Sequence, residues 1–269
     1  MTAYQQTLKH GDTLSVDVAA DPVVPPVDPP PVEPPPNALE IKPAQWNQAY
    51  LDARKDGDVV LLHGGEYNSP FLRVRKKITL QNFSGEVPYL TRTGRPDLLY
   101  HYVDGVVRGL RFVSQSTGFD DSQGAALAEV RAETGAIGLV WYDGCEFVGT
   151  SKMATREQLL YISDLGKTIT EVRVTGTLFD GNGAKGYGIH PYDGPSPKNV
   201  NVTDCTFREL PTNAAVLNAA NACLVKVDRC TFEATIVTYA RGMYGPVDVS
   251  NSKLHGNKIG TVNDRGGNS

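Results

Sequence analysis

Side chains that could transfer protons fall into two groups in this sequence. Asp120 and Asp121 are its only adjacent acids, and two carboxylates that share a site can work as an acid and a base. Neighbouring residues of a strand point to opposite faces, so this pair could act together only in a turn. Lys185, His190 and Arg208 form the second group. They could face one groove as proton donors and acceptors, or be solvated side chains on a surface.

Aromatic side chains gather in the same part of the sequence. Tyr161, Tyr187, His190 and Tyr192, with Asp193 beside them, combine apolar ring faces with polar edges, which suits the binding of a sugar ring. The alternative is a set of rings stacked inside the fold. The direction of each side chain decides between the two interpretations.

A repeated pattern is the scaffold on which these residues must lie. In residues 200–207, apolar or small residues stand seven, five and two positions before a final aromatic, with mostly polar residues between them. This alternation, with a one-residue change of phase, predicts a strand, a tight bend and a second short strand. The pattern returns at five places, which end at Phe112, Phe147, Phe179, Phe232 and Leu254.

Six copies of one pattern predict a solenoid, in which each repeat buries its apolar residues against its neighbours. Val, Thr and Asn dominate the copies and no helical period runs through them, which argues against leucine-rich and helical repeats. The sequence therefore predicts an all-β parallel β-helix. Successive copies end 35, 32, 28, 25 and 22 residues apart, so the loops shrink toward the C-terminus. We expect any binding surface on the early coils, where loops are longest.

Three of the four cysteines follow the repeat. Cys145, Cys205 and Cys230 occupy the same inward position of three copies, which predicts a ladder of small buried side chains, since a free Cys behaves as a small hydrophobe. Cys223 lies outside the pattern. No Cys-x-x-Cys pair indicates a metal site.

Composition narrows the possible partners. The chain has 269 residues, 40 % apolar and 21 % charged, with a formal charge of -4, which is ordinary for a globular protein and gives no reason to expect nucleic acid or a membrane as partner. No stretch approaches the length of a membrane span, and the first six residues lack a secretory pattern. We therefore expect synthesis in a cytoplasm without export.

The N-terminal segment has a different composition from the repeats. Residues 1–20 include Leu14, Val16 and Val18, which alternate with polar residues and predict a strand with one apolar face. A lone strand is marginal in water, so we interpret this segment as a docking arm. Nine of the fifteen residues from Pro22 to Pro36 are proline, which makes residues 21–38 a stiff polyproline II linker. A ligand for an aromatic-lined groove is the alternative for the linker.

Residues 39–269 form the predicted β-helix domain. A short amphipathic helix is expected at about residues 43–56, followed by Gly57-Asp58, an apolar strand and a Gly-x-Tyr turn. This order resembles the entry into the right-handed parallel β-helix of the pectate-lyase-like superfamily, in which the helix caps the open end of the coil. The resemblance covers residues 39–262. A short surface helix is also expected at residues 125–130.

The resemblance implies two kinds of enzyme. Hydrolases of this superfamily use paired carboxylates, for which Asp120 and Asp121 are the candidates, although the Asn-Thr-Asp and Gly-His-Gly motifs of its polygalacturonase-like members are absent. Its lyases abstract a proton beside a substrate carboxylate after Ca²⁺ or basic groups neutralise that acid, which would give roles to Lys185, His190 and Arg208. No cofactor is expected otherwise, and no metal outside a lyase.

An arm, a stiff linker and a β-helix in this order look like a bacteriophage virion protein of the decoration, fibre or tailspike kind. The sequence therefore favours a structural accessory protein of the virion, docked on a capsid or tail protein through residues 1–20, whose β-helix contacts surface carbohydrate. A polysaccharide lyase or glycoside hydrolase is the alternative. No dedicated trimerisation segment is visible.

Overall fold

The computed structural model describes residues 38–68, 70–95, 97–117, 125–153, 157–192, 199–210, 215–220, 223–233, 240–242, 246–254 and 263–269. The chain divides into two units, Met1–Glu33 and Pro34–Ser269, and all the described residues belong to the second. The predicted docking strand with Leu14, Val16 and Val18 lies outside the described residues, as does nearly all of the linker.

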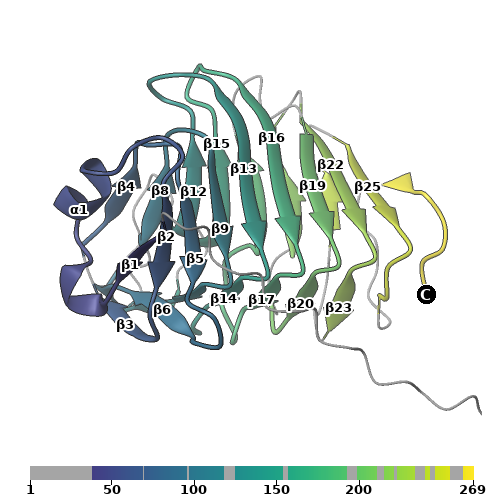
Figure 1. The fold of residues 1–269 in the computed structure, drawn as a ribbon. Helices are drawn as coiled ribbons and strands as arrows, with labels where there is room; N and C mark the ends of the chain where they lie inside the picture. The colour runs from purple at the N-terminus through teal and green to yellow at the C-terminus, as the bar shows by residue number, and fades with distance from the viewer. Residues whose placement is uncertain are drawn as a thin grey trace, which may run out of the picture. The chain divides into compact units, whose positions relative to one another are not determined.

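Three parallel sheets form the walls of the second unit (Figure 1). The first sheet has the order β1-β2-β5-β9-β13-β16-β19-β22-β25-β26. Its strands are Leu39–Ile41, Val59–Leu62, Thr79–Asn82, Gly105–Arg108, Ile137–Asp143, Ile169–Thr175, Asn199–Thr203, Leu224–Asp228, Val247–Ser250 and Asn263–Asp264.

The second and third sheets each take one short strand from every coil. The second contains β3 (Gly65–Asn68), β6 (Pro88–Thr91), β10 (Arg111–Val113), β14 (Glu146–Val148), β17 (Leu178–Asp180), β20 (Thr206–Arg208) and β23 (Thr231–Glu233). The third contains β4 (Leu72–Val74), β8 (Leu99–His101), β12 (Ala126–Arg131), β15 (Gln158–Ser163), β18 (Ile189–Tyr192), β21 (Val216–Asn218) and β24 (Ala240–Gly242). A further pair, β7 (Thr93–Gly94) and β11 (Gln115–Ser116), lies in the loops. The fold is the right-handed parallel β-helix that the sequence predicts.

A left-handed residue turns each coil from the first sheet into the second. It stands three positions before the final residue of every copy of the pattern, with φ between 49° and 60° at Gly109, Gly144, Gly176, Asp204, Arg229 and Asn251. One residue in this conformation reverses the alternation of inward and outward side chains. It is the change of phase seen in the sequence.

The final residues of the copies form a column of rings in the core. Phe112, Phe147, Phe179, Phe207 and Phe232 stack face to face, with ring centroids 4.7 to 5.0 Å apart and planes within 8° of parallel. The predicted cysteine ladder is present beside them, since Cys145, Cys205 and Cys230 are all buried and free. The repeated apolar positions therefore fill the interior of the coil.

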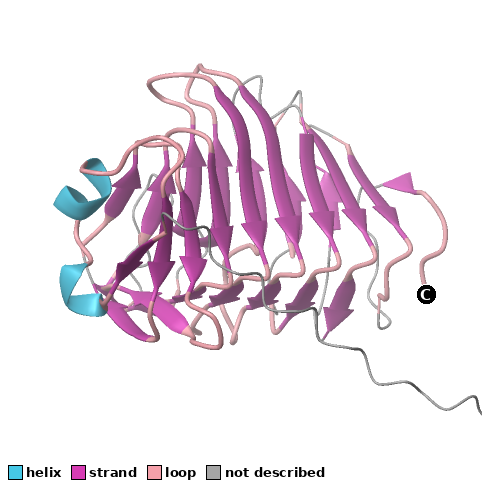
Figure 2. Cartoon of the chain, in the orientation of Figure 1, coloured by secondary structure: helices cyan, strands magenta, loops and turns pink. Residues whose placement is uncertain are grey.

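Both ends of the coil are covered by local structure (Figure 2). The predicted helix at 43–56 is divided into a 3-10 turn, η1 (Pro43–Gln45), and a shorter helix, α1 (Gln48–Asp52). The division falls where the Asn47 side chain caps α1 by accepting from the Tyr50 N–H and buried Trp46 packs edge-on against Tyr67. At the other end, the carbonyls of Gly266 and Ser269 accept from the last full coil.

The prediction of a surface helix at residues 125–130 is wrong. This segment is strand β12, which pairs with β8 on one side and β15 on the other. Its Ala and Leu residues favour a helix locally, but all of them are buried, and pairing within a sheet overrides so short a preference. No helix in the described part of the chain is long and apolar enough to cross a membrane.

The left-handed bend gives a test of the fold. Gly144 has φ 57° and no heavy atom near the position of an added Cβ, so Gly144→Ala suffers only from backbone strain. We expect it to lower the free energy of unfolding by about 1 to 2 kcal/mol. Gly144→Asn should cost less, because Asn tolerates this conformation. Urea unfolding measures which of the two variants is less stable. Equal losses in the free energy of unfolding would contradict backbone strain at the bend as the cause.

Candidate functional site

The predicted aromatic residues meet on the third sheet. The ring of His190 lies 4.8 Å from that of Tyr187, 5.4 Å from Tyr192 and 5.5 Å from Tyr161, measured between centroids. Tyr161 and Tyr192 stack at 6.0 Å with an interplanar angle of 30°. The sequence therefore identified four side chains that form one cluster, which we call the tyrosine–histidine cluster.

This cluster lies on the outer side of the coil. Leu160, Ile162 and Ile189 point into the hydrophobic core, so the alternating residues Tyr161 and His190 point outward. Tyr192 is 39 % exposed, whereas His190 is 7 % exposed. The three tyrosines thus cover the histidine and present ring surface to the outside. The interpretation that the rings stack inside the coil is excluded for Tyr192.

His190 serves this cluster as a neutral ring. Burial lowers the pKa of His190 to about 4, and neither of its ring nitrogens has a hydrogen-bond partner. An imidazole with so low a pKa is a weak base at neutral pH. His190 therefore contacts the three tyrosines through its ring rather than through hydrogen bonds.

The same outward row continues toward the N-terminal end of the coil. Tyr100, Glu129, Tyr161 and His190 are paired in register on β8, β12, β15 and β18, so consecutive side chains are about 4.8 Å apart along the row. The Tyr100 hydroxyl donates to Asp97 Oδ1 at 3.0 Å. An aromatic and acidic row therefore crosses four coils of the third sheet.

Glu129 is the most perturbed carboxyl of this row. It is 2 % exposed, and burial raises its pKa to about 7, although Arg131 and the Tyr100 hydroxyl act in the opposite direction. The Arg131 Nη1 atom lies 3.6 Å from Glu129 Oε1. A carboxylic acid with a pKa near 7 could donate a proton at neutral pH. However, Glu129 and its neighbour Asp97 are both buried, so neither is presented to a polymer.

The structure does not gather the predicted lyase residues in one groove. Arg208 lies on β20 of the second sheet, where its Nη2 and Nε atoms bind Asp180 Oδ2 at 2.6 and 3.0 Å. His190 lies on the third sheet, and Lys185 lies in the exposed turn between β17 and β18. The three residues belong to neighbouring repeats, as the sequence indicated, but they do not lie on the same sheet. Asp120, Asp121 and Asp193 lie outside the described residues.

Glu129 was missed in the sequence because its segment was interpreted as a helix. In the strand, its neighbours Ala128 and Val130 point inward, which leaves an acid on the outer face. The signal was the alternation of apolar and other residues after residue 126, but so short a run fits a helix equally well.

Within the described residues, no three His, Cys, Asp or Glu side chains are grouped so that they could hold a metal ion. A bound Ca²⁺ needs several carboxylate or carbonyl oxygens around one point. No such group of acidic side chains for the Ca²⁺ of a lyase is present among the described residues.

Comparisons with known proteins give a fold-level similarity. No protein-family model matches the chain, and no curated protein matches it. Among solved structures, a mutant of the PL6 family alginate lyase AlyGC is similar over 86 % of this chain, with 13 % sequence identity and a TM-score of 0.48. The chain spans 38 % of that enzyme's length.

The raised pKa of Glu129 predicts a pH dependence of stability. Between its ordinary value of 4.5 and about 7, the folded state holds a proton that the unfolded state releases, so stability falls as pH rises through this window. Glu129→Gln should abolish this decrease in the free energy of unfolding, which is on the order of 3 kcal/mol. The measurement is urea unfolding of wild type and variant from pH 4 to 8.

Glu233, an exposed residue at the end of β23 on the second sheet, provides the control for this measurement. Glu233→Gln should leave the pH dependence of wild type in place, because the side chain is exposed and lies on another wall of the coil. Buried His101 and His190 have lowered pKa values and act in the opposite direction, so the difference between variants is compared rather than the absolute slope. Parallel curves for wild type and Glu129→Gln would contradict a protonated Glu129.

Proposed function

We propose that this chain is a carbohydrate-binding β-helix protein, and that the tyrosine–histidine cluster is its sugar-contacting surface. The observation that supports the proposal is the convergence of Tyr161, Tyr187 and Tyr192 around one buried histidine on the outer face of a rigid sheet. A cluster so placed needs no rearrangement before it meets a ligand, and a preformed surface loses less free energy on binding.

The chemistry of these side chains suits a sugar. The C–H face of a sugar ring packs on an aromatic ring, and tyrosine hydroxyls exchange hydrogen bonds with the sugar's own hydroxyls. Because Tyr161 and Tyr192 stand on neighbouring strands, about 4.8 Å apart, a chain of sugars would cross the strands rather than follow one of them. An elongated glycan therefore fits the surface better than a single small sugar does.

The biological setting of the proposal is a bacteriophage virion. Its support is in the sequence: an alternating strand with Leu14, Val16 and Val18, separated from the β-helix by a proline-rich linker. In this setting the strand would extend a sheet of a capsid or tail protein, with the apolar side chains filling pockets there. The β-helix would then project outward as a decoration, fibre or spike element that binds surface carbohydrate.

A polysaccharide-degrading enzyme is the second candidate. It is favoured by Glu129, whose pKa of about 7 is that of a general acid, with Asp97 linked to the same site through Tyr100. The burial of both carboxyls weighs against it. In a hydrolase or lyase of this kind, Glu129→Gln would abolish the release of reducing or unsaturated sugar ends while leaving glycan binding intact.

Glycan binding by the cluster is tested by removing its most exposed ring. Tyr192→Ala should weaken binding to a responsive polysaccharide about five- to tenfold, the effect of losing one aromatic contact. The measurement is a glycan array followed by titration calorimetry on the best ligand. Tyr89→Ala, on the second sheet, is the matched control and should bind as wild type does. If wild type, Tyr192→Ala and Tyr89→Ala bind with equal affinity, the cluster is not the surface that binds the glycan.

Docking through the arm is tested by truncation. Deleting residues 1–36 should abolish association with purified particles in sedimentation, because the alternating strand is lost. The β-helix should keep its thermal unfolding transition, followed by circular dichroism, since its first strand, β1, begins at Leu39. If the truncated protein still sediments with particles, the arm is not the anchor.

A further inference from the structure

His63 lies between two carboxylates that belong to different turns of the chain. Its Nδ1 atom lies 3.0 Å from Glu86 Oε1, and its Nε2 atom lies 3.1 Å from Glu40 Oε2. Glu40 stands on β1, His63 directly follows β2, and Glu86 lies in the loop between β5 and β6. One imidazole ring therefore joins the segments of three successive strands of the first sheet, β1, β2 and β5.

The two contacts of this ring can both be hydrogen bonds only if the ring is protonated. A neutral imidazole has one N–H donor and one nitrogen that accepts, whereas an imidazolium donates from both nitrogens. An ionised carboxylate only accepts, so a neutral His63 would turn the lone pair of one nitrogen toward a carboxylate oxygen. The hydrogen bonds to Glu86 and Glu40 accordingly raise the pKa of His63 above its ordinary value of 6.5.

The coil holds the histidine in place from one side. Glu86 Oε2 accepts from the backbone N–H of Gly64, and this bond, together with that of His63, holds the pKa of Glu86 below its ordinary value. The ring of His63 stacks on that of Phe83, with centroids 4.4 Å apart and planes 26° from parallel. The position of the histidine is therefore set by residues of the coil, and Glu40 is the partner that β1 contributes.

β1 is a short strand at the edge of its sheet. It contains three residues, Leu39–Ile41, and it pairs with β2 on one side. Ile41 is buried in the core, and its carbonyl accepts from the Tyr67 hydroxyl at 2.8 Å and from the His63 N–H at 3.0 Å. The contact of Glu40 with His63 adds a charged bond to a strand that is too short to be stable alone.

Two further ionisable groups face this cluster. Lys42 carries a positive charge that acts on Glu86. The Tyr67 hydroxyl donates to the His63 carbonyl at 2.9 Å, and burial raises the pKa of Tyr67 to about 12. Histidine is the side chain whose charge ordinarily changes between pH 5 and 8, so loss of the His63 proton is the change to expect near neutral pH.

We propose that His63 is a pH-dependent clasp, whose imidazolium ties β1 to the coil and whose neutral ring lets β1 separate from β2. The ring binds its proton more tightly when β1 is in place, so the clasp is fully formed below the ordinary pKa of 6.5 and is lost as pH rises through the raised pKa. The proline-rich segment continues directly into β1, so separation would add the three residues of β1 to the linker. The clasp depends neither on glycan binding nor on docking of the arm.

The amide of His63 reports on this event, because it donates to the Ile41 carbonyl of β1. Its protection from hydrogen exchange is measured by NMR on the full chain and corrected for the intrinsic exchange rate at each pH. This protection should fall about two- to fivefold as pH rises through the pKa of His63, the effect of losing one partly exposed ion pair. The Phe83 amide, which donates to the Leu62 carbonyl of β2, is the internal reference and should keep its protection.

A charge-removing variant separates the clasp from general loosening. Glu40→Gln should lower the pKa of His63, read from its imidazole Cε1 proton, and should abolish the step in protection, because a glutamine amide can bond to either form of the ring. Glu66→Gln, which changes an acid of β3 that accepts from Thr91, is the matched control and should behave as wild type does.

Three results would overturn the proposal. The His63 amide of wild type could keep the same protection at every pH, or Glu40→Gln could retain the step. The Phe83 amide could also lose protection in parallel with that of His63, which would mean that the whole end of the coil loosens and that β1 is not released by itself.

Discussion

The in-register stacking of one coil on the next is the constraint on which the structure depends. Each strand pairs with the equivalent strand of the coils before and after it, and the column from Phe112 to Phe232 repeats the same contact in the core. A slip of one residue would turn apolar side chains outward in a whole coil. Since the register cannot slip, outward residues must also stand in rows, and these rows make the surfaces of the molecule.

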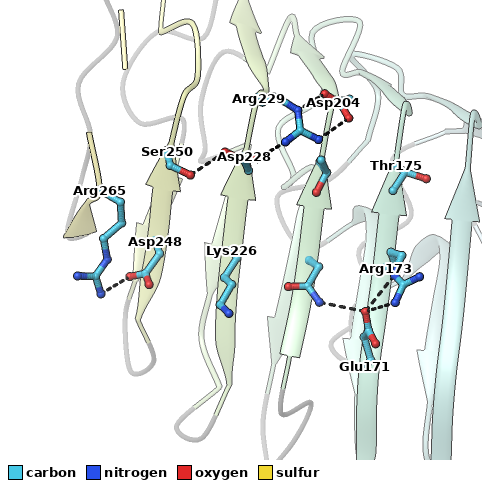
Figure 3. Close-up of a pocket in the computed structure, with 12 residues that line it drawn as sticks. Glu171, Arg173, Thr175, Asp204, Lys226, Asp228, Arg229, Asp248, Ser250 and Arg265 are labelled. Carbon is cyan, nitrogen blue, oxygen red and sulfur yellow. Dashed lines mark hydrogen bonds and ion pairs between the residues drawn. The ribbon is translucent and has the colours of Figure 1, made fainter. Parts of the chain in front are cut away.

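The first and third sheets differ in the outward side chains that their rows contain. On the first sheet, acids and bases of neighbouring coils form ion pairs, as Asp204 and Arg229 do (Figure 3). On the third sheet the row is aromatic and partly buried, and burial raises the pKa of Glu129 there to about 7. One wall therefore presents paired charges, and the other presents ring surfaces. The core that carries both is the same repeated set of residues.

The sequence predicted the parts of the fold that repeat. The copies ending at Phe147 or Phe207 predicted the strands of the first two sheets and the bend between them. This was possible because each copy of the pattern could be compared with the others. The third sheet was harder, since its strands follow loops of unequal length and share no common spacing. Residues 125–130 were assigned to a helix for this reason, and Glu129 was lost with them.

The sites show the same limit. Tyr161 and His190 could be grouped from the sequence because both are ring-bearing residues in short apolar segments that follow successive copies of the pattern. The ion pairs between coils, such as Arg229 with Asp204, could not be predicted, since they join residues that are far apart in the sequence. The polar residues between apolar ones were visible, but which of them pair depends on the register of three or four strands at once.

The two ends of the coil affect how the molecule behaves in concentrated solution. An open β-helix exposes strand edges whose unpaired backbone groups invite another molecule to continue the coil, which is how fibrils grow. Here β26 occupies one edge by pairing with β25, and the carbonyl of Ser269 accepts from the N–H of Leu254. At the opposite end, Gln48 of α1 binds the backbone of Arg73 through both its amide nitrogen and its oxygen. The two covers bond to these strand ends, so fewer backbone groups are left there for a second molecule to pair with.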